Sequence, residues 1–247
     1  MGNGTFYGIS VGPGDPELLT LKGLRLLQQA PVVAFPAGIG NKTGLAQQTV
    51  TPWLAPTQHQ LSLHFPYVQD KDKLRQAWKV AADKVWQFLK IGKDVVFACE
   101  GDVSFYSTFT YLAQTLLQHH PDVLVESVPG VCSPVAAAAA LGLPLTVGKQ
   151  RLAVLPALYC LSDLEQALTW AETIVLLKIS SVYSQVWQIL QQYQLLERSW
   201  VVERVGLPDR VIYRDLHARP QLQLSYFSLL IVQQELPLSR TGLITDG

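Results

Sequence analysis

Residues Gly8–Thr20 read GISVGPGDPELLT, and this stretch decides the fold class of the chain. It continues the apolar segment Thr5–Val11, whose composition is typical of a buried strand. Asp15 is suited to cap a following helix, Pro16 to occupy its first position and Glu17 to lie near its positive end. The stretch therefore predicts a strand, a tight turn and a helix, which together open an α/β fold.

The turn contains Gly12 and Gly14, which permit sharp backbone turns and the close approach of another molecule. It is not a P-loop, because no Gly-Lys-Ser/Thr follows the first glycine and its four spacers. It is not a Rossmann fingerprint either, because Glu17 stands where the motif, started at Gly12, needs its last glycine. Two interpretations stay open: a loop that contacts a ligand, and a well-capped turn that needs none.

Outward from this stretch, short apolar segments alternate with helical patterns along the chain. We predict strands at Thr5–Val11, Val32–Phe35, Asp94–Cys99, Val123–Val128, Leu152–Leu155, Thr173–Leu177, Ser199–Val205 and Phe227–Val232. We predict helices at Pro16–Ala30, Lys71–Ile91, Tyr106–His120, Ser133–Leu141, Leu161–Ala171 and Val182–Tyr193. This alternation indicates an α/β architecture.

The pattern of strands and helices restarts after Pro129-Gly130, which predicts two α/β domains, residues 1–128 and 129–247. The use of basic residues changes in the same part of the chain. Residues 1–150 hold nine of the ten lysines, and residues 151–247 hold seven of the nine arginines.

The composition narrows the class of protein. Of the 247 residues 49% are hydrophobic and 15% charged, which allows a sizeable core. The formal net charge is zero, which argues against nucleic-acid binding because such binding needs a basic footprint. No apolar stretch is long enough to cross a membrane and the N-terminus does not resemble a signal peptide, so we expect a cytoplasmic protein without a membrane partner.

The chain has three cysteines, Cys99, Cys132 and Cys160. No two stand at metal-ligand spacing and their number is odd, so the sequence indicates neither a metal site nor a disulfide framework. Their neighbours are apolar or small, and we predict buried thiols.

Three further motifs each follow a predicted strand: CEGDVSFYST at Cys99–Thr108, SVPGVCS at Ser127–Ser133 and ERVGLPDR at Glu203–Arg210. Together with GPGDPELLTLK at Gly12–Lys22, they resemble in order and spacing the motifs of the tetrapyrrole (corrin/porphyrin) methylases. The resemblance extends over nearly the whole chain.

Within that family, four segments look most like the enzymes that methylate carbon C20 of precorrin-2 or cobalt-factor II. They are GDVSFYSTFTYL (101–112), LLKIS (176–180), VVERVGLPDRVIY (201–213) and YFSLLIV (226–232). The family's uroporphyrinogen III methylase typically carries an acidic-basic pair where this chain has Phe35-Pro36-Ala37-Gly38. One departure is Val103, since proline commonly follows Gly-Asp in the family.

The resemblance implies two α/β domains with the active-site cleft between them, in a homodimer. It implies S-adenosyl-L-methionine as cofactor, bound in that cleft and released as S-adenosyl-L-homocysteine, and a tetrapyrrole substrate facing the first glycine loop. The implied activity is C-methylation in cobalamin biosynthesis. The alternatives are a tetrapyrrole methylase of different regiochemistry and a non-catalytic small-molecule binding protein on the same fold.

The resemblance also assigns site residues. Those expected to contact the cofactor are Pro13, Gly101, Asp102, Phe105, Cys132, Ser133, Lys178 and Val205. The first glycine loop, with Gly12, Gly14 and Asp15, is expected to face the substrate. Because the substrate carries eight carboxylates, the candidate cations that bind it are Lys22, Arg204, Arg210 and Arg214. The alternative for most of the three arginines is a solvated surface position.

The candidate catalytic groups are Asp102, Lys178 and Tyr106. Asp102 is either the base that removes the C20 proton or a group that positions a ligand. Lys178 either meets a ligand or extends its ammonium to solvent from a strand end. Tyr106 either donates to a propionate or packs. The residues leave each pair of alternatives open.

Overall fold

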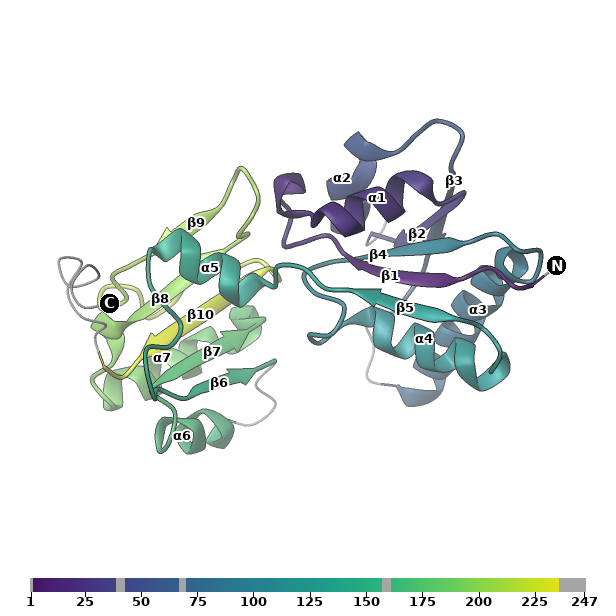
Figure 1. Ribbon diagram of the computed structural model, residues 1–247. Coiled ribbons are helices and arrows are strands. Elements are labelled where there is room, and N and C mark those ends of the chain that lie inside the picture. Colours follow the sequence, from purple (N-terminus) through teal and green to yellow (C-terminus); the bar gives the residue numbers. More distant parts are fainter. Residues whose placement is uncertain (1, 39–42, 67–69, 157–160, 236–247) are drawn as a thin grey trace. The chain divides into compact units, whose positions relative to one another are not determined.

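The computed structural model describes residues 2–38, 43–66, 70–156 and 161–235. By its internal contacts the chain separates into two compact units, Met1–Cys132 and Ser133–Gly247. Each unit contains one sheet with helices, so the predicted α/β class is confirmed (Figure 1). The predicted boundary between residues 128 and 129 falls shortly before this division.

The first unit is built on a parallel sheet with the strand order β3-β2-β4-β1-β5. Its strands are β1 (Phe6–Ser10), β2 (Val32–Pro36), β3 (His59–Leu63), β4 (Val95–Cys99) and β5 (Val125–Val128). The central strands read as apolar runs because a parallel sheet is covered on both faces. In β4, for example, all five residues are buried.

Helices cover both faces of this first sheet. On one face α1 (Leu21–Gln29) and α2 (Leu45–Val50) enclose a core that includes Ile9, Val33 and Val96. On the other face α3 (Lys71–Leu89) and α4 (Thr108–His119) enclose a core that includes Phe6, Phe97 and Phe109. The neighbouring strands β1 and β4 are thus followed by helices on opposite faces, which makes their carboxyl ends a topological switch point.

The second unit has a mixed sheet with the order β6-β7-β10-β8-β9, in which β10 is antiparallel to both neighbours. Its strands are β6 (Leu152–Leu155), β7 (Thr173–Leu177), β8 (Ser199–Glu203), β9 (Val211–Tyr213) and β10 (Ser228–Gln233). Its helices are α5 (Ser133–Leu141), α6 (Ser162–Leu168) and α7 (Tyr183–Gln192). Because β7 and β8 both run antiparallel to β10, their carboxyl ends lie at the end of the sheet where β10 begins.

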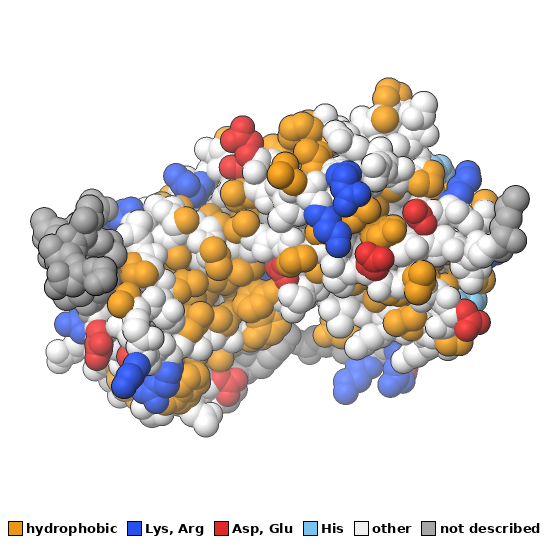
Figure 2. Space-filling model, viewed as in Figure 1, with side chains coloured by type: hydrophobic (Ala, Val, Ile, Leu, Met, Phe, Trp, Pro, Cys, Tyr) orange, Lys and Arg blue, Asp and Glu red, His pale blue; other side chains and the backbone are white. Residues whose placement is uncertain are grey.

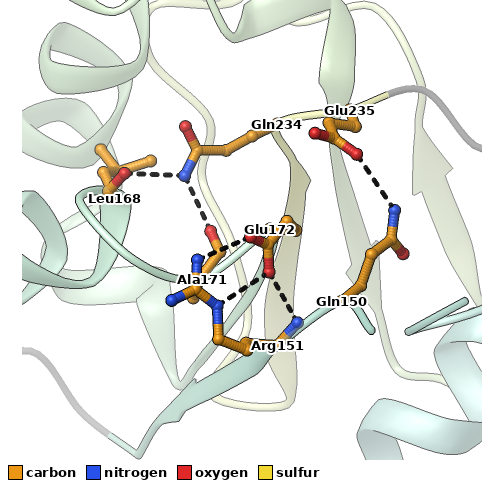
Figure 3. Close-up of polar contacts among 7 residues, drawn as sticks. All are labelled: Gln150, Arg151, Leu168, Ala171, Glu172, Gln234 and Glu235. Carbon is orange, nitrogen blue, oxygen red and sulfur yellow. Dashed lines mark hydrogen bonds and ion pairs between the residues drawn. The ribbon is translucent and has the colours of Figure 1, made fainter. Parts of the chain in front are cut away.

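At the opposite end of the second sheet, where β6 and β7 begin and β10 ends, side chains are hydrogen-bonded to one another and to the main chain (Figure 3). The Arg151 guanidinium donates to the Glu172 carboxylate, Nη2 to Oε1 at 2.7 Å, and the Arg151 backbone N–H donates to Oε2 at 2.6 Å. The Gln234 side-chain amide donates to the Leu168 carbonyl at the end of α6 and to the Ala171 carbonyl shortly before β7. Gln150 Nε2 lies 3.5 Å from Glu235 Oε2. The polar groups at this end of the sheet are therefore satisfied by partners within the protein.

Charges of both signs are mixed on the molecular surface. On the face drawn in Figure 2, Lys and Arg side chains are scattered among Asp and Glu side chains, with hydrophobic side chains between them. Within the described residues, no helix is long and apolar enough to cross a membrane.

The predicted helix Pro16–Ala30 is wrong in one respect, because it is two elements. A short 3-10 turn, Pro16–Leu18, is followed by α1. The Thr20 hydroxyl accepts from the Gly23 N–H at 3.1 Å with extended backbone at Thr20, so α1 has its own cap. The predicted capping by Asp15 is confirmed for the 3-10 turn, where its carboxylate accepts from the Glu17 N–H at 2.9 Å.

Helix α2 and strands β3 and β9 lack a strong sequence signal, and the sequence does not predict them. The same holds for the short 3-10 helices Thr51–Trp53, Ile179–Ser181 and Leu196–Arg198. The edge strand β3 reads HQLSL, and only Leu63 of its five residues is buried. Helix α2 has six residues and β9 has three. The predicted helix at Tyr106–His120 begins later, at Thr108, because the Ser107 hydroxyl caps it by accepting from the Phe109 N–H.

Candidate functional site

The two glycine loops of the first unit meet at the carboxyl ends of β1 and β4. Gly12 and Gly101 form an antiparallel bridge: Gly12 N–H donates to the Gly101 carbonyl at 3.2 Å and Gly101 N–H to the Gly12 carbonyl at 2.8 Å. The loops belong to strands whose following helices lie on opposite faces, the place where open α/β sheets bind ligands. The structure thus brings together two motifs that are far apart in the sequence.

Gly101 offers uncovered backbone at this place. Its φ is +68°, in the region that favours glycine, and a Cβ built on it would meet no atom within 4 Å. The side of Gly101 that a side chain would occupy is therefore open, and a ligand can approach the main chain closely there.

Asp102, directly after Gly101, is the hub of a hydrogen-bond network. Its Oδ1 accepts from the Ser104 N–H at 2.8 Å and from the Ser104 hydroxyl. Its Oδ2 accepts from the Gly130 N–H at 2.6 Å and lies 3.2 Å from the Ser10 hydroxyl. The carboxylate is buried, with 7% of the residue exposed. One side chain thus joins the last residue of β1 to the segments that follow β4 and β5.

These contacts determine the ionisation of Asp102. Burial raises the pKa of the carboxyl, but hydrogen bonds from Ser104, Gly130 and Ser10 stabilise the charged form, and the net effect is a lowered pKa. Both oxygens already accept hydrogen bonds from the protein. The geometry is therefore that of a fixed anion that shapes the site, and it gives little room for proton abstraction from a ligand.

The segment between Asp102 and α4 exposes aromatic groups. Tyr106 is 54% exposed with φ of 52°, and its ring makes an edge contact with Phe105 at 4.8 Å between centroids. Cys99 lies below, with Sγ 2.9 Å from the Ser107 hydroxyl oxygen, and burial raises the pKa of its thiol to about 11. Cys99 is therefore the inert buried thiol that the sequence predicts.

In the second unit, two cationic residues follow β7 and β8, the two strands that flank β10 and run antiparallel to it. Lys178 and Arg204 both have left-handed backbone, with φ of 56° and 55°. The Lys178 N–H donates to the Ser228 carbonyl at 2.9 Å, and the Arg204 N–H to the Phe227 carbonyl at 2.8 Å. Both residues are therefore held against the start of β10. Such backbone costs a non-glycine residue on the order of 1–3 kcal/mol and gathers at functional sites.

The two cations differ in their partners. The Lys178 ammonium lies 5.1 Å from the centre of the Tyr226 ring, and no carboxylate in the described part of the chain lies within ion-pair distance of it. The Arg204 Nε lies 2.7 Å from Asp209 Oδ2. The exposed Lys178 ammonium is thus available to an anion, while Arg204 already has a carboxylate partner.

The other predicted residues are distributed over both units. In the first unit Pro13 is buried, Gly14 and Asp15 are half-buried and Lys22 is exposed on α1. In the second unit Val205 is buried, and the exposed Arg210 and Arg214 flank β9.

Cys132 and Ser133 stand on the two sides of the division between the units and are half-buried, so Cys132 is less buried than predicted. Cys160 lies outside the described residues.

Four residues of these networks were not predicted: Ser10, Ser104, Gly130 and Tyr226. Gly130 is within the SVPGVCS motif, and a Cβ there would come within 2.6 Å of the Ser10 Cβ, so only glycine fits without a shift. The sequence alone does not show that Gly130 and Ser10 lie this close together. Among the described residues, no group of three or more His, Cys, Asp or Glu is placed to hold a metal.

A family model described as Tetrapyrrole (Corrin/Porphyrin) Methylases matches residues 5–219. The chain belongs to the tetrapyrrole methylase family. This confirms the resemblance that the four sequence motifs indicate.

Individual relatives cover nearly the whole chain. The chain is 31% identical to a cobalt-precorrin-2 C(20)-methyltransferase of Salmonella typhimurium, over 94% of this chain and 98% of that protein. It is also 31% identical to a precorrin-2 C(20)-methyltransferase of a Sinorhizobium species, over 94% and 96%. Among solved structures, a Thermus thermophilus uroporphyrin-III C-methyltransferase complexed with S-adenosyl homocysteine is 26% identical, with a TM-score of 0.64 over 94% of this chain and 98% of that one.

Proposed function

We propose that the protein is an S-adenosyl-L-methionine-dependent C-methyltransferase of cobalamin biosynthesis that methylates C20 of precorrin-2 or cobalt-factor II. The observation that carries this proposal is that relatives named for the C20 reaction align over 94% of the chain. The paired glycine loops at the switch point of the first sheet support it, because they present backbone to a ligand without the features of a phosphate site.

The cofactor fits the chemistry of this site. It has no phosphate and needs backbone donors and acceptors beside small residues, and the open side of Gly101 provides such a surface. We propose that it contacts the residues assigned from the sequence: Pro13, Gly101, Asp102, Phe105, Cys132, Ser133, Lys178 and Val205.

S-adenosyl-L-methionine, when bound, supplies a methyl group on a sulfonium that is an excellent leaving group. The work left to the protein is orientation, which can be worth an effective concentration on the order of 10⁵–10⁸ M. We assign that work in the first unit to Asp102, whose four contacts fix its own loop and hold it against the end of β1 and the segment after β5. In this proposal the Asp102 carboxylate acts by positioning, contact with the cofactor is left to the main chain of that residue, and the C20 proton is released to solvent water.

The carboxylates of the tetrapyrrole need cations and hydrogen-bond donors. We propose that the exposed Lys178 ammonium and the exposed Tyr106 hydroxyl bind them directly. The remaining substrate contacts are proposed for Gly12, Gly14, Asp15, Lys22, Arg204, Arg210 and Arg214. Arg204 would then bind a carboxylate in exchange for, or in addition to, its contact with Asp209. We also propose that the protein works as a cytoplasmic homodimer.

The proposal is tested first by calorimetry with S-adenosyl-L-homocysteine, ATP and NAD. We expect binding of S-adenosyl-L-homocysteine and no comparable affinity for the two nucleotides. Transfer of a labelled methyl group to precorrin-2 or cobalt-factor II is then measured. Binding without transfer to either compound would favour a non-catalytic binding protein, and displacement of S-adenosyl-L-homocysteine by ATP would show that the glycine loops were misinterpreted.

A further inference from the structure

The turn that begins at Asp102 is closed by its own backbone. The Phe105 N–H donates to the Asp102 carbonyl at 3.1 Å, which makes residues 102–105 a β-turn with Val103 at its second position. The Asp102 carboxylate also accepts from the Ser104 N–H at 2.8 Å. The Val103 N–H has a distant partner, unlike the Ser104 and Phe105 N–H groups, which both donate to Asp102, and Val103 itself is only 2% exposed.

The distant partner is Ser10, the last residue of β1. Its side chain is fully buried, and its hydroxyl oxygen accepts from the Val103 N–H at 2.9 Å. A hydroxyl has one hydrogen to donate, and two acceptors are in reach: the Val128 carbonyl at 2.8 Å and Asp102 Oδ2 at 3.2 Å. One buried hydroxyl thus contacts the turn after β4, the end of β5 and the Asp102 carboxylate.

We propose that Ser10 is a positioning residue of the methyl-transfer site: its hydroxyl oxygen holds the Val103 N–H and thereby fixes the Asp102–Phe105 turn beside Gly101. The physical reason is that a buried N–H without an acceptor is unfavourable, so the turn would leave this conformation if Ser10 lost its oxygen. A ligand that binds only the fixed turn would then bind more weakly, in proportion to the fraction of molecules that keep it. The inference rests on the proposed function, because it takes the ligand of this turn to be the cofactor.

A double-mutant cycle isolates the Ser10–Val103 contact. Proline is favoured at the second position of common β-turns and has no N–H, so Val103→Pro removes the donor while the turn can be kept. Val103→Ala is the matched control, because it also loses buried side-chain volume but keeps the N–H. We expect Ser10→Ala to weaken S-adenosyl-L-homocysteine binding about tenfold in the wild-type and Val103→Ala backgrounds, and less than about threefold in the Val103→Pro background.

Hydrogen exchange in the ligand-free protein provides a readout that does not depend on the ligand or on Val103→Pro folding. We expect Ser10→Ala to speed exchange of the Val103 amide at least about tenfold while the amides of β4 stay protected. If the wild-type protein fails to bind S-adenosyl-L-homocysteine, the proposed function is contradicted, and the exchange of Val103 still decides whether Ser10 holds the turn.

Two results would overturn the inference. One is an equal effect of Ser10→Ala on affinity in the Val103→Pro and Val103→Ala backgrounds. The other is a lower melting temperature of Ser10→Ala with unchanged affinity and unchanged exchange at Val103, which is the behaviour of a hydroxyl that stabilises the fold and nothing else.

Discussion

The carboxyl ends of the strands carry polar groups in both units, but these groups are satisfied in different ways. In the first unit both oxygens of Asp102 accept hydrogen bonds from the protein and the carboxylate is buried. In the second unit Lys178 is exposed, has a left-handed backbone and contacts the ring of Tyr226. The first arrangement is complete without a ligand, and the second leaves a cation available.

This difference separates two kinds of site residue. A group whose contacts are all internal acts by holding the shape of the site, so its removal should affect every ligand together. A group that faces solvent with a charge acts on the ligand directly, so its removal should affect the ligand that bears the opposite charge.

The largest effect is expected at Asp102. Asp102→Ala leaves the part-buried N–H groups of Gly130 and Ser104 without their acceptor, and we expect cofactor affinity and transfer rate to fall together by about 10³-fold. Asp102→Asn keeps the shape but places an amide donor opposite some of these donors, and we expect a loss of about 30-fold. Calorimetry and single-turnover rates measure the two quantities.

The outcome that would reverse the assignment of Asp102 concerns the same variant. A fall in transfer rate of about 10²-fold or more in Asp102→Asn, with both ligands bound at wild-type affinity, would identify Asp102 as the base.

A smaller but specific loss is expected at Gly101. Gly101→Val introduces a branched side chain on a backbone of φ +68° and fills the open side of the loop, so we expect S-adenosyl-L-homocysteine affinity to fall about 10²-fold. Gly142→Val is the matched control, because Gly142 has φ of +69° and also no atom within 4 Å of a built Cβ. Both variants should melt at lower temperature, and equal cofactor affinity in the two would remove the Gly101 loop from the site.

At the carboxyl end of β7, Lys178→Met should weaken binding of the substrate. The change removes the charge and keeps most of the apolar stem, so we expect the KM for the tetrapyrrole to rise about tenfold, and more at low salt than at high salt. Lys149→Met is the control, because Lys149 is an exposed lysine of the same unit outside the candidate site. Similar kinetics of the two variants would mean that Lys178 is an ordinary surface residue.

The smallest effect is expected at the opposite end of that sheet, where Arg151 and Glu172 precede β6 and β7. Hydrogen bonds from Arg151 lower the pKa of Glu172 to about 2 from its usual 4.5, so this carboxylate stabilises the fold above pH 4.5 and loses that contribution as the pH falls towards 2. Glu172→Gln should therefore flatten the dependence of stability on pH in that range and shift the melting temperature near neutral pH by less than about 3 °C, because the pair is exposed. A change in cofactor affinity in this variant would show that the Arg151–Glu172 end of the sheet is not independent of the candidate site.

Much of the fold can be predicted from the sequence because the central strands are buried on both faces. Val95–Cys99 and Thr173–Leu177 are continuous apolar runs, and such runs need no knowledge of their neighbours. The edge strand His59–Leu63 is polar and half-exposed, so its pairing with β2 is what makes it a strand. Tertiary contact, which a local pattern cannot contain, decides such elements.

The site divides in the same way. Gly12, Gly101 and Asp102 could be predicted because they stand in motifs with a recognisable order. Ser10 could not, since a serine at the end of an apolar strand gives no sign of its partners. One of them, the Val103 N–H, is 93 residues away and another, the Val128 carbonyl, is 118 residues away. The left-handed backbone of Lys178 is likewise determined by the start of β10 and not by its own sequence.

Methylation of C20 is tested by locating the transferred methyl group on the product. The purified protein is incubated with precorrin-2 or cobalt-factor II and S-adenosyl-L-methionine labelled with ¹³C in the methyl group, and the new methyl is located by NMR. We predict a single labelled methyl on C20, formed in one-to-one proportion with S-adenosyl-L-homocysteine. A label on any other carbon, or no label in a protein that binds S-adenosyl-L-homocysteine, would contradict the account.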